Sequence, residues 1–99
     1  MHISDLNGKS VCVLGYGREG QAMVQALEKY APAATITIAD QNTELRVKNY
    51  ELRVGDAYLD RLDDFDVIIK SPGIPPSELL TTHYQLLTTP TQIFFDSIK

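Results

Sequence analysis

Five short runs of apolar and β-branched residues divide this chain, and each is bounded by glycine, proline or polar residues. Such runs are typical of β-strands. The strands that this pattern predicts are Ser10–Leu14, Thr35–Ala39, Tyr50–Val54, Asp66–Lys70 and a short Gln85–Thr88. Tyr50–Val54 alternates apolar with charged residues, as expected of an edge strand with one solvated face. Asp66–Lys70 is apolar on both faces and is predicted to be central.

Three further segments have the pattern of helices. Residues 19–30 repeat apolar side chains at a spacing of 3.6 residues, with Met23 and Leu27 on one face. Residues 76–84 predict a second helix. The sequence Thr-Pro-Thr-Gln at 89–92 is typical of a helix start, with threonine at the N-cap, proline at the first helical position and glutamine at N3.

Strands and helices therefore alternate, which predicts a parallel sheet with right-handed crossovers. We expect an α/β, Rossmann-like three-layer domain, with a mostly parallel five-stranded sheet in the order 3-2-1-4-5 and helices on both faces. The 99 residues suffice for one such domain. Its ligand crevice should lie at the carboxyl ends of strands 1, 2 and 4, where the loops at 15–20, 40–42 and 71–74 meet.

Composition narrows the class of ligand. The net charge of −4 argues against a nucleic-acid or anionic-membrane partner. The single cysteine, Cys12, lies in the first expected strand and is predicted to be a buried thiol. Neither His2 nor His83 has partners at metal-ligand spacing, so no metal site is expected. With no long apolar span or signal peptide, a cytoplasmic location is expected.

The glycines Gly15, Gly17 and Gly20 form a G-x-G-x-x-G pattern between the first strand and the first helix. In such a loop the first glycine permits a tight turn, the second lets a ligand approach the backbone, and the third lets the helix pack closely. The helix N-terminus favours an anion, so we expect a phosphorylated ligand. Arg18 and Glu19 either reach a diphosphate or are solvated charges.

Two further features lie at the expected crevice. Asp40 follows Gly20 by twenty residues and ends the second strand. Its carboxylate suits a ribose hydroxyl, the imide N–H of uracil, or a cap for the following turn. The sequence Ser-Pro-Gly-Ile-Pro-Pro at 71–76 predicts either a rigid loop at the crevice rim or simple termination of the strand.

The sequence contains no ATP-binding P-loop. Gly8-Lys9-Ser10 resembles the end of one, but Ile3 stands where a glycine is needed, and the strand follows the motif instead of preceding it. We therefore expect no ATP site and no catalytic residue in this chain, which by itself binds without reacting.

Three motifs together resemble the N-terminal domain of the Mur ligase family, and in particular its glutamate-adding members. They are Gly-Tyr-Gly-Arg-Glu-Gly-Gln-Ala at 15–22, Asp40, and Ile-Lys-Ser-Pro-Gly-Ile-Pro at 69–75. The likeness spans essentially all 99 residues, and the Ser-Pro-Gly-Ile loop is its most specific element. It implies that residues 1–99 are the UDP-binding domain of a cytoplasmic, three-domain ligase of peptidoglycan synthesis, which bears on cell shape and division.

The resemblance also implies a substrate and partners. The UDP part of UDP-N-acetylmuramoyl-L-alanine would bind here, while the remaining domains in cis bind ATP, magnesium and the incoming D-glutamate. The substrate carboxylate is activated as an acyl phosphate, which the amine then attacks. The residues implied to contact UDP are Gly15, Gly17, Arg18, Glu19, Gly20, Asp40, Gln41, Asn42, Ser71, Pro72 and Gly73.

This chain departs from the family pattern at two places. Arg18-Glu19 replaces an apolar–threonine pair common in the glutamate-adding enzymes, and Gln41-Asn42 lacks the basic residue that some members have.

Two other functions fit the residues. The spacing from Gly20 to Asp40 suits half of an NAD-dependent dehydrogenase, although the loop at 71–76 is unusual there. A non-enzymatic nucleotide-sensing module is the second.

Overall fold

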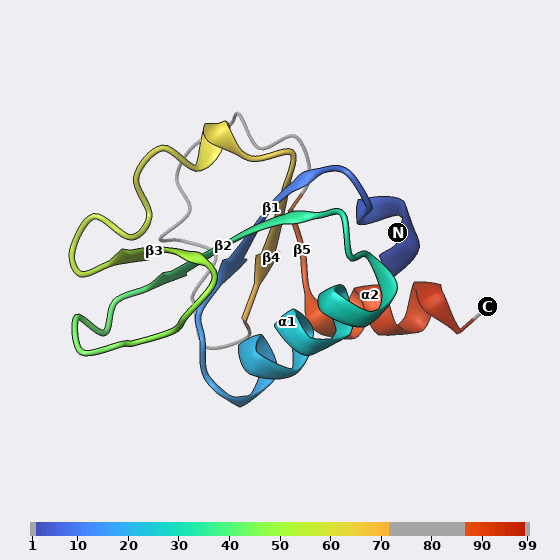
Figure 1. The fold of residues 1–99 in the computed structure, drawn as a ribbon, viewed down its shortest axis with the longest axis horizontal. Coiled ribbons are helices and arrows are strands. Elements are labelled where there is room, and N and C mark those ends of the chain that lie inside the picture. Colours follow the sequence, from blue (N-terminus) through green and yellow to red (C-terminus); the bar gives the residue numbers. More distant parts are fainter. Residues whose placement is uncertain (1, 72–86, 99) are drawn as a thin grey trace.

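The computed structural model describes residues 2–71 and 87–98 (Figure 1). Its elements are, in order, η1 (Ile3–Leu6), β1 (Ser10–Leu14), α1 (Arg18–Tyr30), β2 (Thr35–Asp40), β3 (Glu51–Val54), η2 (Leu62–Asp64), β4 (Val67–Lys70), β5 (Leu87–Thr88) and α2 (Pro90–Ser97). All five expected strands have a counterpart, and the first and third expected helices are α1 and α2. The helix expected at 76–84 lies outside the described residues.

The strands form one parallel sheet in the order β3-β2-β1-β4-β5, as the sequence predicts. The strands β1 to β4 have four to six residues each and form most of it, while β5 adds two residues beside β4. At the centre, Val13 of β1 is in register with Ile38 of β2 and Ile69 of β4. The carboxyl ends of β1, β2 and β4 therefore lie side by side, where a ligand crevice is expected.

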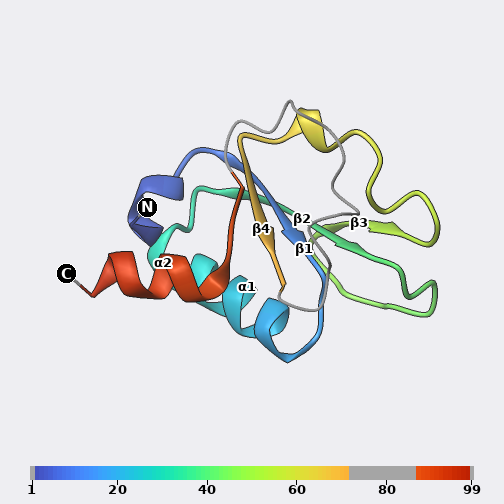
Figure 2. The same cartoon turned by 180° about the vertical axis from the view of Figure 1, so that it is seen from behind.

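One face of the sheet is covered by α1, α2 and η1 (Figures 1 and 2). Its core contains Val13 and Ile38 from the sheet, Leu27 from α1, Ile93 from α2 and Leu6 from η1, all almost inaccessible to solvent. The N-cap expected at Thr89 is confirmed, since its side chain accepts a hydrogen bond from the Gln92 N–H at 3.1 Å. Neither helix in the described part of the chain has the length and apolar character of a membrane span.

The opposite face is described only in part, because residues 72–86 lie outside the described residues, so the expectation of helices on both faces is not tested. Its core contains Cys12 and Ile68 from the sheet, together with Tyr58, Leu62 and Phe65 from the segment between β3 and β4. Among the described residues this cover is a loop with one 3-10 turn, η2, and not an α-helix. Burial raises the pKa of the Cys12 thiol to about 12, so the expected buried thiol stays protonated.

Arg53 of β3 holds this loop against the sheet. Its guanidinium stacks over the Phe65 ring, with the central carbon 4.7 Å from the ring centroid. The same group donates to the carbonyls of Asp60 and Arg61 at 3.3 Å and pairs with the Asp64 carboxylate at 3.2 Å. The solvated face predicted for β3 is therefore partly closed by its own arginine, because the long side chain packs its planar head on an aromatic ring.

Asp66 joins the beginnings of β1 and β4. Its Oδ2 accepts hydrogen bonds from the Ser10 N–H at 3.0 Å and the Ser10 hydroxyl at 3.1 Å, and its own N–H donates to Ser10 Oγ at 2.9 Å. The bonds from the Ser10 backbone and hydroxyl lower the pKa of Asp66 below its usual 3.8. The ionised carboxylate is thus the form that stabilises the fold.

We expect Asp66→Ala to lower the melting temperature at neutral pH. A carboxylate whose pKa is lowered by folding contributes stability above its unfolded pKa and loses it as the pH falls through the folded pKa. The difference in melting temperature between the native chain and the variant should therefore shrink below about pH 4. Thermal melts followed by circular dichroism from pH 7 to pH 2 measure it. A constant difference over this range would contradict the role of the charge.

Candidate functional site

The loop between β1 and α1 makes a tight turn at Gly15, whose φ of +94° is a conformation that favours glycine. The Gly15 N–H donates to the Ala39 carbonyl of β2 at 2.7 Å. A Cβ placed on Gly20 would lie 2.0 Å from the Gly15 carbonyl oxygen and 3.6 Å from a Val13 methyl. The start of α1 therefore packs directly on the turn, and the predicted reason for glycine at position 20 is confirmed.

Gly17 has a different environment. It is the N-cap of α1 with a φ of −77°, and a Cβ placed on it would meet no atom within 4 Å. The first bond within the helix runs from the Gln21 N–H to the Gly17 carbonyl at 2.9 Å. The N–H groups of the first turn therefore point out of the helix end, where its dipole favours an anion. Open space and outward N–H groups occur here together.

Asp40 connects two of the three expected loops. Its Oδ2 accepts a hydrogen bond from the Tyr16 N–H of the glycine loop at 2.7 Å, and its Oδ1 accepts one from the Asn42 N–H at 2.8 Å. The second bond caps the turn that follows β2, which is one of the roles that the sequence left open for Asp40. The first was not predicted, because the backbone N–H of Tyr16 carries no signal in the sequence. Contact between Asp40 and a ribose or uracil stays a prediction.

The third loop begins at Ser71, directly after β4. The Ser71 N–H donates to the Leu14 carbonyl at 3.0 Å, and its hydroxyl donates to the Gly15 carbonyl at 3.3 Å. The preceding Lys70 is a buried cation whose ammonium donates to the Ser71 carbonyl at 3.3 Å. The structure thus brings Gly15, Asp40 and Ser71 together. Pro72 and Gly73 lie outside the described residues.

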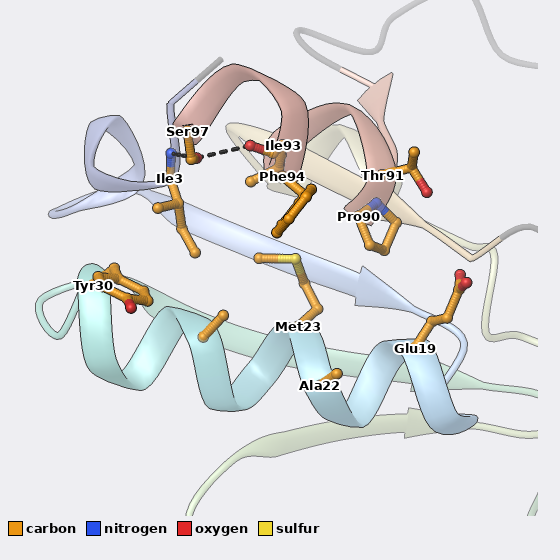
Figure 3. A pocket seen from close by; sticks show the side chains of 11 residues that line it. Ile3, Glu19, Ala22, Met23, Tyr30, Pro90, Thr91, Ile93, Phe94 and Ser97 are labelled. Carbon is orange, nitrogen blue, oxygen red and sulfur yellow. Dashed lines mark hydrogen bonds between the residues drawn. The ribbon is translucent and has the colours of Figure 1, made fainter. Parts of the chain in front are cut away.

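The other expected site residues have exposed side chains. Arg18, Gln41 and Asn42 lie at the surface, and the Asn42 side-chain oxygen accepts a bond from the Glu44 N–H at 2.9 Å. The Glu19 side chain lines a cleft between α1 and α2 (Figure 3). Among the described site residues only Glu19 lines that cleft, so its side chain borders a different space from Gly15, Asp40 and Ser71.

The cleft has a volume of about 360 Å³ and runs along α1 from Glu19 to Tyr30 (Figure 3). Its lining is mainly apolar and includes Ile3, Met23, Pro90, Ile93 and Phe94. The sequence did not predict this cleft, although the two adjacent phenylalanines of α2, Phe94 and Phe95, indicated apolar surface near the end of the chain.

Within residues 2–71 and 87–98, no group of three or more His, Cys, Asp or Glu side chains is placed to hold a metal ion.

A parallel α/β sheet with a glycine turn at a helix start is consistent with the Rossmann-like class. Sequence similarity to known proteins defines the class of protein more closely. The chain is 37% identical over 82 residues to a protein of Salinispora tropica named UDP-N-acetylmuramoyl-L-alanine--L-glutamate ligase, a match that covers 76% of this chain and 18% of that protein. It is 40% identical over 81 residues to a protein of the same name from Xanthomonas campestris pv. campestris, covering 77% and 17%.

A third relative, from Ligilactobacillus salivarius, is named UDP-N-acetylmuramoylalanine--D-glutamate ligase. It is 33% identical over 88 residues, which cover 81% of this chain and 19% of that protein. No family model matches the chain, and no solved structure matches it significantly.

The chain is therefore related to the glutamate-adding Mur ligases, and it corresponds to part of such a ligase. It spans less than one fifth of the length of these relatives. The resemblance stated from the sequence is confirmed at this level. Two of the three names specify L-glutamate and one specifies the expected D-glutamate, so what they share is a muramoylalanine–glutamate ligase.

Alanine substitutions of Gly20 and Gly17 should differ strongly in their effect on stability. Gly20→Ala should lower the free energy of unfolding by roughly 3 kcal/mol or more, because the new methyl group overlaps a backbone carbonyl that cannot yield. Gly17→Ala adds its methyl group to open space at an ordinary φ and should change it by less than about 1 kcal/mol. Urea denaturation of both variants measures the difference. Equal losses would contradict the close packing of α1 on the Gly15 turn.

Proposed function

We propose that this chain is the UDP-binding domain of an ATP-dependent ligase that adds glutamate to UDP-N-acetylmuramoyl-L-alanine in peptidoglycan synthesis. The chain holds the UDP part of the substrate in the crevice formed by the glycine loop, the Asp40 turn and the loop that begins at Ser71. The names of the relatives support the substrate, and the open helix end at Gly17 supports the place where the diphosphate binds.

The chemistry of this site suits an anion despite the acidic chain. The site offers the outward N–H groups of the first turn of α1, which bind phosphate oxygens without a basic patch. Gly17 leaves room for the diphosphate to reach these groups. Asp40 holds the Tyr16 N–H and so keeps the loop in the conformation that presents them. Uracil and ribose then extend toward the turn at 40–42.

In this proposal the chain binds substrate and the remaining domains carry out the reaction. Because the chain has no P-loop sequence, ATP and Mg²⁺ bind to those domains. There ATP converts the muramoyl-linked carboxylate to an acyl phosphate, and the amine of glutamate displaces the phosphate to form the amide. The contribution of this chain is to fix the UDP end of the substrate, so that its carboxylate lies at one place.

An NAD-dependent dehydrogenase remains the principal rival. It would use Asp40 for the ribose hydroxyls, and this carboxylate keeps further lone pairs beside the two backbone N–H groups that it accepts. The ligase names of the relatives favour a UDP-linked substrate over NAD. A non-enzymatic nucleotide sensor would bind the same class of ligand, and it differs from the proposal in having no ligase domains in the same polypeptide.

Gly17→Val should weaken the binding of UDP-N-acetylmuramoyl-L-alanine by about tenfold or more, which corresponds to about 1.4 kcal/mol. The branched side chain fills the space that the diphosphate needs, while the φ of −77° imposes no strain on it. Isothermal titration calorimetry gives the affinity, and thermal melting checks the fold. Gly17→Ala is the matched control, and its smaller side chain should cause a smaller loss. Unchanged affinity in folded Gly17→Val protein would show that the loop is only a turn.

The crevice should prefer UDP-linked ligands to NAD. We expect UDP-N-acetylmuramoyl-L-alanine, and more weakly UDP, to shift the amide resonances of Gly17 and Asp40 in an NMR titration. NAD at the same concentration should leave them unshifted. Resonances of Ser10 and Asp66, which lie at the beginnings of β1 and β4 and so at the opposite edge of the sheet, serve as the internal control. Shifts caused by NAD and not by UDP would support the dehydrogenase instead.

A further inference from the structure

The helix α2 and its C-cap, Ile98, carry three large apolar side chains on the solvent side. Phe94, Phe95 and Ile98 are 64%, 56% and 63% exposed, whereas Ile93 is buried against the core. At 100° per residue the three exposed side chains fall on one arc of about 100°, away from Ile93. The rings of Phe94 and Phe95 contact each other edge to face, with centroids 6.5 Å apart.

This stripe is continuous with the cleft between α1 and α2. Phe94 belongs to both, and in Figure 3 its side chain lies above Met23 of α1. At the far end of the cleft Tyr30 is 52% exposed. We call the cleft together with Phe95 and Ile98 the α1–α2 apolar face. Contiguous exposed apolar surface that combines a hollow with protruding aromatic rings is typical of a protein–protein contact.

Both ends of the chain lie beside this face. The Ile3 N–H of η1 donates to the Ser97 hydroxyl of α2 at 2.9 Å, and that hydroxyl donates to the Ile93 carbonyl at 2.7 Å. The ends marked N and C lie on the same side of the domain in Figures 1 and 2. A polypeptide attached to either end therefore starts next to the α1–α2 apolar face.

We propose that the α1–α2 apolar face is the docking surface for an adjoining domain of the same ligase polypeptide. The relatives are more than five times as long as the segment that they share with this chain, so most of such a ligase lies outside it. A covalently attached neighbour has a high effective concentration, and an apolar side chain from it fits the mainly apolar cleft. The inference rests on the proposed function in one respect, namely that the native polypeptide is a longer ligase.

This placement also bears on the substrate site. Glu19 lies at one end of the cleft and in the first turn of α1, whose N–H groups face the proposed diphosphate. A domain seated on the α1–α2 apolar face therefore lies beside the glycine loop. The rest of the substrate, which continues from the diphosphate, has only a short way to reach that domain.

Cysteine labelling tests the proposal directly. Phe95→Cys and, as a control, Gln25→Cys on the exposed side of α1 are each made in this 99-residue chain and in the complete native polypeptide that carries it. The native Cys12 is buried, so it reacts slowly in both. We expect a maleimide to label Phe95→Cys at least tenfold more slowly in the complete polypeptide than in the chain, and Gln25→Cys at the same rate in both.

Equal labelling rates for Phe95→Cys would overturn the proposal, as would a native polypeptide no longer than this chain. Protection that already occurs in the chain and grows with its concentration would assign the face to a second copy. Phe95→Asp supplies a second measurement. This variant should leave the melting temperature of the chain unchanged and lower that of the complete polypeptide. If Phe95 only stabilised the fold of the chain itself, the substitution would lower both melting temperatures.

The same samples separate this inference from the proposed function. The binding of UDP-N-acetylmuramoyl-L-alanine to the complete polypeptide is measured by calorimetry beside the labelling. Protection of Phe95→Cys without binding of this substrate would support the docking surface and contradict the proposed UDP site. Binding of the substrate without protection would support the UDP site and contradict the docking surface.

Discussion

The close approach of α1 to the turn at Gly15 is the contact on which the rest of the site depends. The Gly15 carbonyl oxygen lies only 2.0 Å from the position that a Cβ of Gly20 would take, so the start of α1 packs against the end of β1. Its first turn, and so its outward N–H groups, are placed at the carboxyl edge of the sheet. A larger residue at position 20 would push the helix away and move these groups from the crevice.

Asp40 shows how an acidic chain can build a site for an anionic ligand. Its carboxylate accepts the Tyr16 and Asn42 N–H groups, so its charge is directed into the protein. The ligand is left with backbone donors on a short loop that is held by the Ala39 carbonyl and the Asp40 carboxylate of β2 and by the Ser71 hydroxyl after β4. Binding by backbone dipoles needs accurate loop geometry more than it needs net positive charge.

The described residues cover the two faces of the sheet by different means. On one face, helices bury aliphatic side chains such as Leu27 and Ile93, and they leave an apolar stripe of α2 facing outward. On the other face, a loop is held by Arg53, which combines a stack on Phe65 with hydrogen bonds to carbonyls. Apolar burial fixes the first face, and on the second the Arg53 side chain organises the described loop between β3 and β4.

The sequence by itself determined the strands, the two described helices, the strand order and the steric need for glycine at Gly20, because periodicity and glycine spacing are local properties. It also indicated the ligase family through motifs that lie in loops. Only the tertiary structure decided that Asp40 holds the Tyr16 N–H, that Glu19 faces a cleft and that Phe94 is exposed. These facts depend on contacts between residues far apart in the chain, and backbone groups such as the Tyr16 N–H are common to every residue, so no pattern in the sequence marks them.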